Sequence, residues 1–346
     1  MYINFMIDEN KNIYISYWLL LMILLLALMI TIGGITRITD SGLSITKWDL
    51  FTGILPPLSL AKWEELFNLY KQIPEYKLLN SSMTLEGFKN IFWWEYIHRL
   101  LGRIIGIFYI LPLFFFTYKK ILNKKSLIIL YLIFFLICFQ GFVGWYMVQS
   151  GLSVRTDVSH YRLSIHLTIA FIIFIFLIWN YLFFSNSNIK IRTLNLPFKS
   201  SIVFLVLILI QISLGAFVSG LDAGKIYQTW PLMNSNYFPD DVTANIFLTI
   251  EMFETPSLVQ FFHRNLAYII FIYFLFIFFL VFREKNFYHL RKSIILVFIV
   301  LSLQIVLGIL TILSGAHMYL AITHQLGSVF LIISSLNLIF NDYKTN

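Results

Sequence analysis

The dominant pattern along this chain is a series of long apolar runs separated by shorter polar segments. Because a helix rises about 1.5 Å per residue, about 20 apolar residues cross the roughly 30 Å hydrocarbon core of a membrane. Runs of this length lie near residues 14–35, 91–117, 126–148, 161–184, 199–220, 257–282, 292–313 and 318–340. The pattern therefore predicts an all-α integral membrane protein with eight transmembrane helices.

Composition supports this class and excludes a soluble domain, since 59% of the residues are hydrophobic and only 12% are charged. The net charge of +8 indicates membrane orientation and no nucleic-acid partner, because the Lys and Arg residues concentrate in three loops. These loops are residues 118–126, 185–200 and 283–292. By the positive-inside rule they face the cytoplasm, so both termini are cytoplasmic and the segments 36–90, 149–160 and 221–256 face outward.

The ends of the chain and its single cysteine narrow the cellular location. Cys138 falls within the third predicted helix, so no intramolecular disulfide can form. Asp8 and Glu9 lie near the N-terminus without an Arg-rich amphipathic stretch, which argues against a mitochondrial transit peptide. We therefore expect a multi-pass protein of a bacterial inner membrane.

The chain repeats itself at the level of four helices. EYIHR at residues 95–99 corresponds to QFFHR at 260–264, an offset of 165, and FQGFVGW in the third helix corresponds to LQIVLGI in the seventh. Since four helices are an even number, the two halves share one orientation, as parallel repeats do. The sequence predicts two pseudo-symmetric four-helix bundles, an N-terminal half of residues 1–190 and a C-terminal half of 191–346.

Four histidines occur at one depth in this repeat. His98, His166, His263 and His324 each lie about six or seven residues below the outer end of a helix, or roughly 9–10 Å. Two imidazoles per bundle at one level suit a haem iron with two axial histidines. The competing interpretation for each is a helix-to-helix hydrogen bond, and zinc is a poor alternative because each half offers two histidines and no cysteine ligand.

Other ionisable groups accompany these histidines inside the membrane, where such residues are rare and usually functional. Glu95, Arg99 and Arg103 surround His98, and Arg264 follows His263. A guanidinium at this depth requires an anionic partner, which haem propionates would supply. Pairing with Glu95 or Glu254 is the competing explanation for the arginines.

The remaining histidines and the first outer segment carry weaker signals. His160 and His317 are expected at the outer interface, in contact with solvent or propionates, and His289 on the surface of a cytoplasmic loop. Ser59 is expected to cap a short helix beginning LAKWEELFNLYKQ, within an outer segment that covers the site.

Three stretches resemble the haem A synthase family, in its proteobacterial and mitochondrial branch. They are GGITRITDSGLSITKW, PEYKLLNSSMTLEGFKNIFWWEYIHRLLGRIIG and HRNLAY. The family consists of membrane enzymes that oxidise the C8 methyl of haem O to the formyl of haem A for cytochrome oxidase, and its fold is two pseudo-symmetric four-helix bundles. Some bacterial members carry a cysteine pair in the first outer loop, which this sequence lacks.

The resemblance implies a role for each candidate residue. His263 and His324 correspond to the axial ligands of the iron of a haem b cofactor in the C-terminal half. His98 and His166 correspond to the substrate haem site of the N-terminal half, and Glu95 to the essential acid. The oxidation removes four electrons and needs proton acceptors, so haem b would receive electrons while Glu95, one turn from His98, would reach the substrate.

The same resemblance implies a set of partners: haem O as substrate, an electron acceptor and the lipid bilayer. The haem O synthase (protohaem farnesyltransferase) and cytochrome oxidase assembly factors are candidate protein partners. A second copy of this chain, in a homo-oligomer, is a further candidate. Two rival classes remain. A di-haem b-type electron-transfer subunit explains four histidines but assigns no role to Glu95, and a haem exporter explains binding in one half only if the ligand leaves.

Overall fold

The computed structural model describes residues 9–48, 52–153, 155–186, 194–243, 246 and 249–343, and its regular secondary structure there is helical apart from one isolated bridge between Met233 and Asn236. The long helices are α1 (Glu9–Ile38), α4 (Leu85–Tyr118), α5 (Lys124–Gln149), α6 (His160–Phe184), α7 (Ser200–Gly220), α8 (Pro256–Arg283), α9 (Arg291–Leu313) and α10 (Met318–Tyr343). Within this part of the chain, eight helices are long and apolar enough to cross a membrane. The predicted all-α fold class and its eight spans are confirmed.

The largest boundary difference concerns α4, which begins at Leu85 instead of near residue 91. Thr84 caps this helix, and its Oγ1 accepts a hydrogen bond of 3.2 Å from the Gly87 amide. Hydropathy marks where a chain enters hydrocarbon, whereas the cap marks where the helix begins. The first turns of α4 therefore precede its apolar run.

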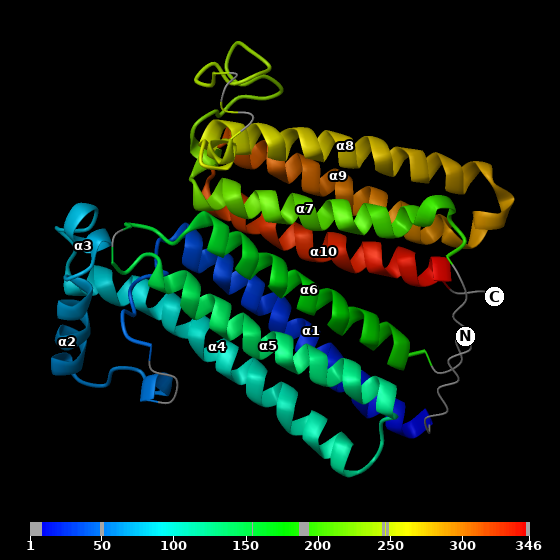
Figure 1. Cartoon of the computed structure of the whole chain (residues 1–346), viewed down its shortest axis with the longest axis horizontal. Coiled ribbons are helices and arrows are strands. Elements are labelled where there is room, and N and C mark those ends of the chain that lie inside the picture. The colour runs from blue at the N-terminus through cyan, green and yellow to red at the C-terminus, as the bar shows by residue number, and fades with distance from the viewer. Residues whose placement is uncertain are drawn as a thin grey trace.

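Two short helices, α2 (Leu60–Tyr70) and α3 (Pro74–Leu78), lie at the end of the bundle where α4 begins, which we call the cap end (Figure 1). Ser59 caps α2, as predicted, by accepting a hydrogen bond from the Lys62 amide at 3.3 Å. An aromatic cluster holds α2 against the first turns of α4. Its rings belong to Trp63, Phe67, Tyr70, Phe88, Phe92 and Tyr96.

The eight long helices form two groups of four that lie side by side (Figure 1). In the first group, α1 and α5 each pack against α4 and α6; in the second, α7 and α9 each pack against α8 and α10. Contacts of α6 with α7 and of α1 with α10 join the groups, and one apolar core runs through both. The predicted division at residues 190 and 191, with the basic residues Lys190 and Arg192, lies outside the described residues.

Candidate functional site

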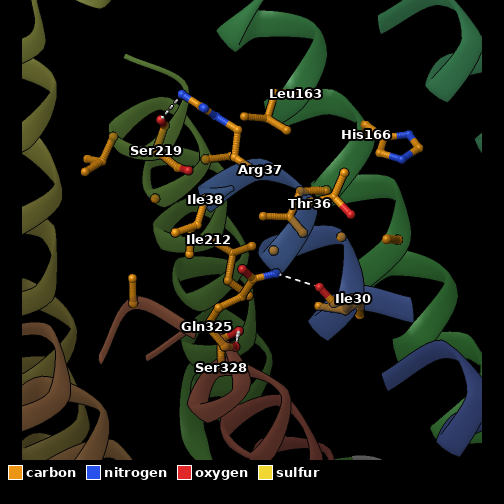
Figure 2. Close-up of a pocket in the computed structure, with 18 of the residues that line it drawn as sticks. Ile30, Thr36, Arg37, Ile38, Leu163, His166, Ile212, Ser219, Gln325 and Ser328 are labelled. Carbon is orange, nitrogen blue, oxygen red and sulfur yellow. Dashed lines mark hydrogen bonds between the residues drawn. The ribbon is translucent and has the colours of Figure 1, made fainter. Parts of the chain in front are cut away.

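The four histidines of the repeat line one partly open cavity of about 900 Å³, to which both groups of helices contribute. Glu95 of α4 and the three arginines Arg99, Arg103 and Arg264 line it too. Figure 2 shows part of this cavity, with α1 between the α6 helix that carries His166 and the α10 helix that carries Gln325. The structure thus brings all the predicted site residues to one space.

The second group of helices presents two imidazoles to each other. The ring centres of His263 on α8 and His324 on α10 are 6.5 Å apart, with the ring planes at 82°. The Nδ1 atoms of both rings are buried without a hydrogen-bond partner among the described residues. Metal–imidazole bonds are about 2 Å long, so two ligands on opposite sides of one metal hold their nitrogens about 4 Å apart and their ring centres somewhat farther. The observed spacing fits two axial ligands of one iron.

Each of the four histidines packs against a glycine of the preceding membrane helix. A Cβ atom added at the glycine would lie 2.9–3.2 Å from the nearest imidazole atom. The pairs are Gly33 with His98, Gly144 with His166, Gly215 with His263, and Gly308 with His324. A methyl group at that distance would push the ring away, so glycine is what allows each imidazole its position.

Glu95 holds the segment that follows α1. Its Oε2 accepts hydrogen bonds from the Ser44 hydroxyl at 2.7 Å and the Ile45 amide at 2.8 Å, and its Oε1 accepts one from Arg99. Arg99 in turn donates to the carbonyl oxygens of Ile45 at 2.8 Å and Lys47 at 3.3 Å. The carboxylate is 2% exposed, so it is enclosed between its helix, this segment and the cavity.

The same construction recurs at the corresponding positions of α8, with an amide in place of the carboxylate. Gln260 donates to the carbonyl oxygens of Ala223 at 2.9 Å and Tyr227 at 3.1 Å. Arg264 donates to Gln260 Oε1 at 3.1 Å, and also to the carbonyls of Tyr227 at 2.9 Å and Leu232 at 3.3 Å. In each group, two residues four positions apart on one helix therefore hold the segment that follows the first helix of the group: Glu95 with Arg99, and Gln260 with Arg264.

These contacts show what the arginines pair with inside the protein. Arg99 pairs with Glu95, as the competing explanation held, whereas Glu254 lies 3.4 Å from His160 and not beside an arginine. Arg264 contacts an amide and carbonyl oxygens, and its Nε is buried without a partner among the described residues. It keeps unused donor capacity at the cavity.

The other histidines divide between surface and interior. His289 and His317 are exposed, as expected. The expectation of a solvated His160 is wrong, because this ring is fully buried. Its Cβ packs where a side chain on Gly220 would stand, and its ring packs on Phe217. The first turn of α6 is covered by the end of α7, a contact that hydropathy does not reveal.

Glu75 of α3 is, besides Glu95, the other buried carboxyl that lines the cavity, and sequence reasoning missed it. The side chain is 3% exposed, and its Oε2 has no hydrogen-bond partner among the described residues. Burial raises the pKa of this carboxyl to about 8, and the charges of Asp157, Asp40 and Glu95 act in the same direction. It is therefore mostly protonated at neutral pH, unlike the carboxylates of the surface.

Arg37, at the end of α1, joins the two groups of helices at the cap end. Its Nη2 donates to the Ser219 carbonyl of α7 at 2.8 Å, which Figure 2 shows as a dashed line. Its guanidinium also pairs with Asp40 at 2.9 Å and lies 3.6 Å from Asp222 and 3.7 Å from Asp157. The acids of three inter-helix segments thus meet one cation that lines the cavity.

Gln325, next to His324, makes the second contact between the groups in that view. Its Nε2 donates to the Ile30 carbonyl of α1 at 2.8 Å (Figure 2). Gly34 leaves the space for it, since a Cβ there would lie 2.0 Å from Gln325 Oε1. The wall between the two histidine pairs is therefore fixed by hydrogen bonds as well as by apolar packing.

Fold and site together define a multi-pass helical membrane protein with two pairs of histidines around one cavity. The family model described as cytochrome oxidase assembly protein, COX15-CtaA, matches residues 16–336. The chain therefore belongs to the COX15-CtaA family of cytochrome oxidase assembly proteins. Membership of a bacterial family and the eight apolar helices support a location in the inner membrane.

Individual relatives agree with the family. The chain is 45% identical over 344 residues to a protein named heme A synthase from Pelagibacter ubique, covering 99% of both chains. It is 43% identical over 316 residues to the heme A synthase of Allorhizobium ampelinum, covering 91% of this chain and 86% of the relative. It is 41% identical over 323 residues to that of Sinorhizobium fredii, covering 93% and 88%. The resemblance noted from the sequence motifs is confirmed.

Proposed function

We propose that this protein is a haem A synthase, an oxidoreductase that converts the C8 methyl group of haem O to the formyl group of haem A. The observation that carries the proposal is the 45% identity to a protein of that name along 99% of both chains. The cavity between two histidine pairs supports it, because haem is a large planar molecule that needs a concave site with axial ligands.

The second half is proposed to hold haem b as the resident cofactor. Its imidazoles stand at the spacing of two axial ligands, their Nδ1 atoms are unpartnered, and the described residues hold no cluster of three or more His, Cys, Asp or Glu side chains that would suit another metal. His263 and His324 would bind the iron. Haem b bound there would supply a one-electron redox centre. Arg264, with its unpartnered Nε, is a candidate partner for a propionate.

The first half is proposed to bind the substrate haem through His98 and His166, which line the same cavity. Arg99 and Arg103 are candidate propionate partners, with Arg99 already holding Glu95. Glu95 is proposed as the catalytic residue that takes up a proton as the methyl group is oxidised. Its counterpart Gln260 also holds the backbone after the first helix of its group, but by donating to carbonyl oxygens where Glu95 accepts from an amide, and it cannot take up a proton, so only the first half carries the acid–base group.

Haem pigments extracted from cells would test the function directly. Cells that make haem O but no haem A should contain the formyl haem after this chain is introduced, because methyl-to-formyl oxidation is the proposed reaction. Liquid chromatography with mass detection measures both haems, and the same cells without the chain are the control. Unchanged haem O beside a low-spin b-type spectrum would instead identify a di-haem electron-transfer subunit, the alternative that the named relatives do not favour.

We further propose that both termini face the cytoplasm and the cap end faces outward. The support is the concentration of Lys and Arg in the loops on the opposite side, at 118–126, 185–200 and 283–292. The segment 36–90 would then cover the outer end of the substrate half. Four electrons leave per haem, so an electron acceptor is required; haem O synthase, oxidase assembly factors and a second copy of this chain are proposed partners.

Cysteine labelling should verify this orientation. In a Cys138→Ser background, Lys62→Cys and Lys225→Cys should react with a membrane-impermeant maleimide in sealed cells, since both lysines are exposed near the cap end. Lys120→Cys, in the loop between α4 and α5, should react only after the membrane is opened. Reaction at position 120 in sealed cells would refute the proposed topology.

A further inference from the structure

Three of the four histidines are tied through their own backbone to the preceding membrane helix. Gln140 donates from Nε2 to the His166 carbonyl, Gln211 to the His263 carbonyl and Gln304 to the His324 carbonyl, each at 2.9 Å. Each glutamine lies four residues before the glycine that packs on the same imidazole. The three sites therefore share a Gln-x-x-x-Gly seam that fixes where the histidine backbone stands.

The fourth site breaks this pattern at one position. Gly33 packs on His98 as the other glycines do, since a Cβ added there would lie 3.2 Å from Nε2, but the residue four positions earlier is Met29. A thioether has no N–H or O–H group to donate. Among the described residues, no side chain donates to the His98 carbonyl. The side chains of α1 instead donate to the Trp94 carbonyl, from Thr36 at 3.4 Å, and to the more distant Phe108 carbonyl, from Trp18 at 2.9 Å.

Met29 lies where the glutamines of the other sites lie. It lines the cavity, and its Cε would stand 3.4 Å from a Cβ atom on Gly102, one turn beyond His98. In the α9–α10 seam, Gln304 likewise stands against Gly327, three residues beyond His324. Met29 thus fills the space of the glutamine without forming its hydrogen bond, and its flexible side chain lets the neighbouring helix shift.

This difference matters because the two halves have opposite requirements. The following inference rests on the proposed function, in which haem b stays in the second half while haem O enters and haem A leaves the first. An interhelical hydrogen bond at a ligand position lowers the freedom of that ligand and so favours retention of the metal it binds. A helix contact without such a hydrogen bond favours dissociation of the ligand and thus exchange of the haem.

We propose that Met29 makes His98 the exchangeable axial ligand of the substrate haem, whereas Gln211 and Gln304 hold both ligands of the resident haem b in place. Gln140 holds His166 in place, so the substrate haem has one fixed axial ligand, His166, and one that dissociates readily, His98. Met29 is a positioning residue in this scheme, since it acts on the haem only through the backbone of His98.

Haem release measures this directly. Purified protein loaded with haem A is mixed with excess apomyoglobin, and the transfer of haem is followed by absorbance. Met29→Gln should slow the release of haem A by about threefold, and by about fifteenfold at most, the range expected from one interhelical hydrogen bond in a membrane protein. The low-spin b-type signal of the second half should stay unchanged.

Two further variants keep the test decisive. Gln304→Met, which removes the hydrogen bond to the His324 carbonyl as Met29 lacks one to His98, should speed the loss of haem b by a similar factor. Met29→Leu, which also lacks an N–H group, should not slow the release of haem A. Release of haem A from Met29→Gln at the unmodified rate would overturn the inference, as would loss of the low-spin substrate signal in Met29→Leu, which would make the Met29 sulfur itself a ligand.

Failure of this inference is distinguishable from failure of the proposed function. A protein that forms haem A, but whose variants release it at equal rates, retains the function and refutes the role of Met29. A protein that forms no haem A in the pigment experiment refutes the function itself.

Discussion

The Glu95→Gln variant is expected to insert in the membrane, retain its haem b and bind haem O, yet convert almost none of it. Glutamine keeps the size and the hydrogen-bond acceptor of glutamate but cannot take up a proton. Positioned proton transfer contributes about 10²–10⁴-fold to an enzymatic rate, so the loss should be at least about 100-fold. Pigment extracts should show haem O accumulating and haem A absent.

The chain contains its own evidence that this substitution preserves the local structure. Gln260 occupies the corresponding position in α8, where its amide binds two backbone carbonyls and its oxygen accepts from Arg264. An amide at position 95 can accept from Arg99 through its oxygen, as Gln260 accepts from Arg264, and can donate to the Ser44 hydroxyl, so that only the Ile45 amide loses its acceptor. Formation of haem A by Glu95→Gln at near the unmodified rate would show that Glu95 only holds the segment after α1.

Substitution of His263 or His324 by alanine should abolish the low-spin, bis-histidine b-type spectrum. Each imidazole is one of the two rings that face each other at 6.5 Å, and the described residues place no third histidine with them. Loss of either ring leaves one axial position without a protein ligand. Optical and electron paramagnetic resonance spectra of the purified variants measure the change.

His289→Ala provides the matched control for that experiment, because this histidine is exposed on the loop before α9 and lies outside the cavity lining. Its spectrum should equal that of the unmodified protein. A low-spin signal that survives in both His263→Ala and His324→Ala would place haem b elsewhere, most directly on His98 and His166.

The relation between Glu95 and Gln260 shows how far a repeat in sequence extends into structure. The offset of 165 residues aligns the two positions from the sequence alone. The structure adds that both side chains hold the backbone after the first helix of their group, together with an arginine four residues later. The recurring Gln-x-x-x-Gly spacing was equally visible in the sequence, although only the hydrogen bonds to His166, His263 and His324 gave it a meaning.

The sequence by itself determined the eight helices and the four histidines that line the cavity. Hydrocarbon thickness demands apolar runs of one length, and ionisable residues within such runs are rare enough to stand out individually. Both signals are local, so they can be read without knowing which helices are neighbours. Helix starts such as Leu85 do not follow from hydropathy, because a cap sets them.

Only the tertiary structure decided which groups meet. Arg37 reaches Ser219 across 182 residues because α6 packs against both α1 and α7, and Gln325 reaches Ile30 across 295 because α1 packs against α10. Glu75 lies in an ordinary polar segment of the sequence, and only folding of the cap over the cavity buries its carboxyl. Long-range contacts of this kind depend on how whole helices pack, which hydropathy and spacing along the chain do not encode.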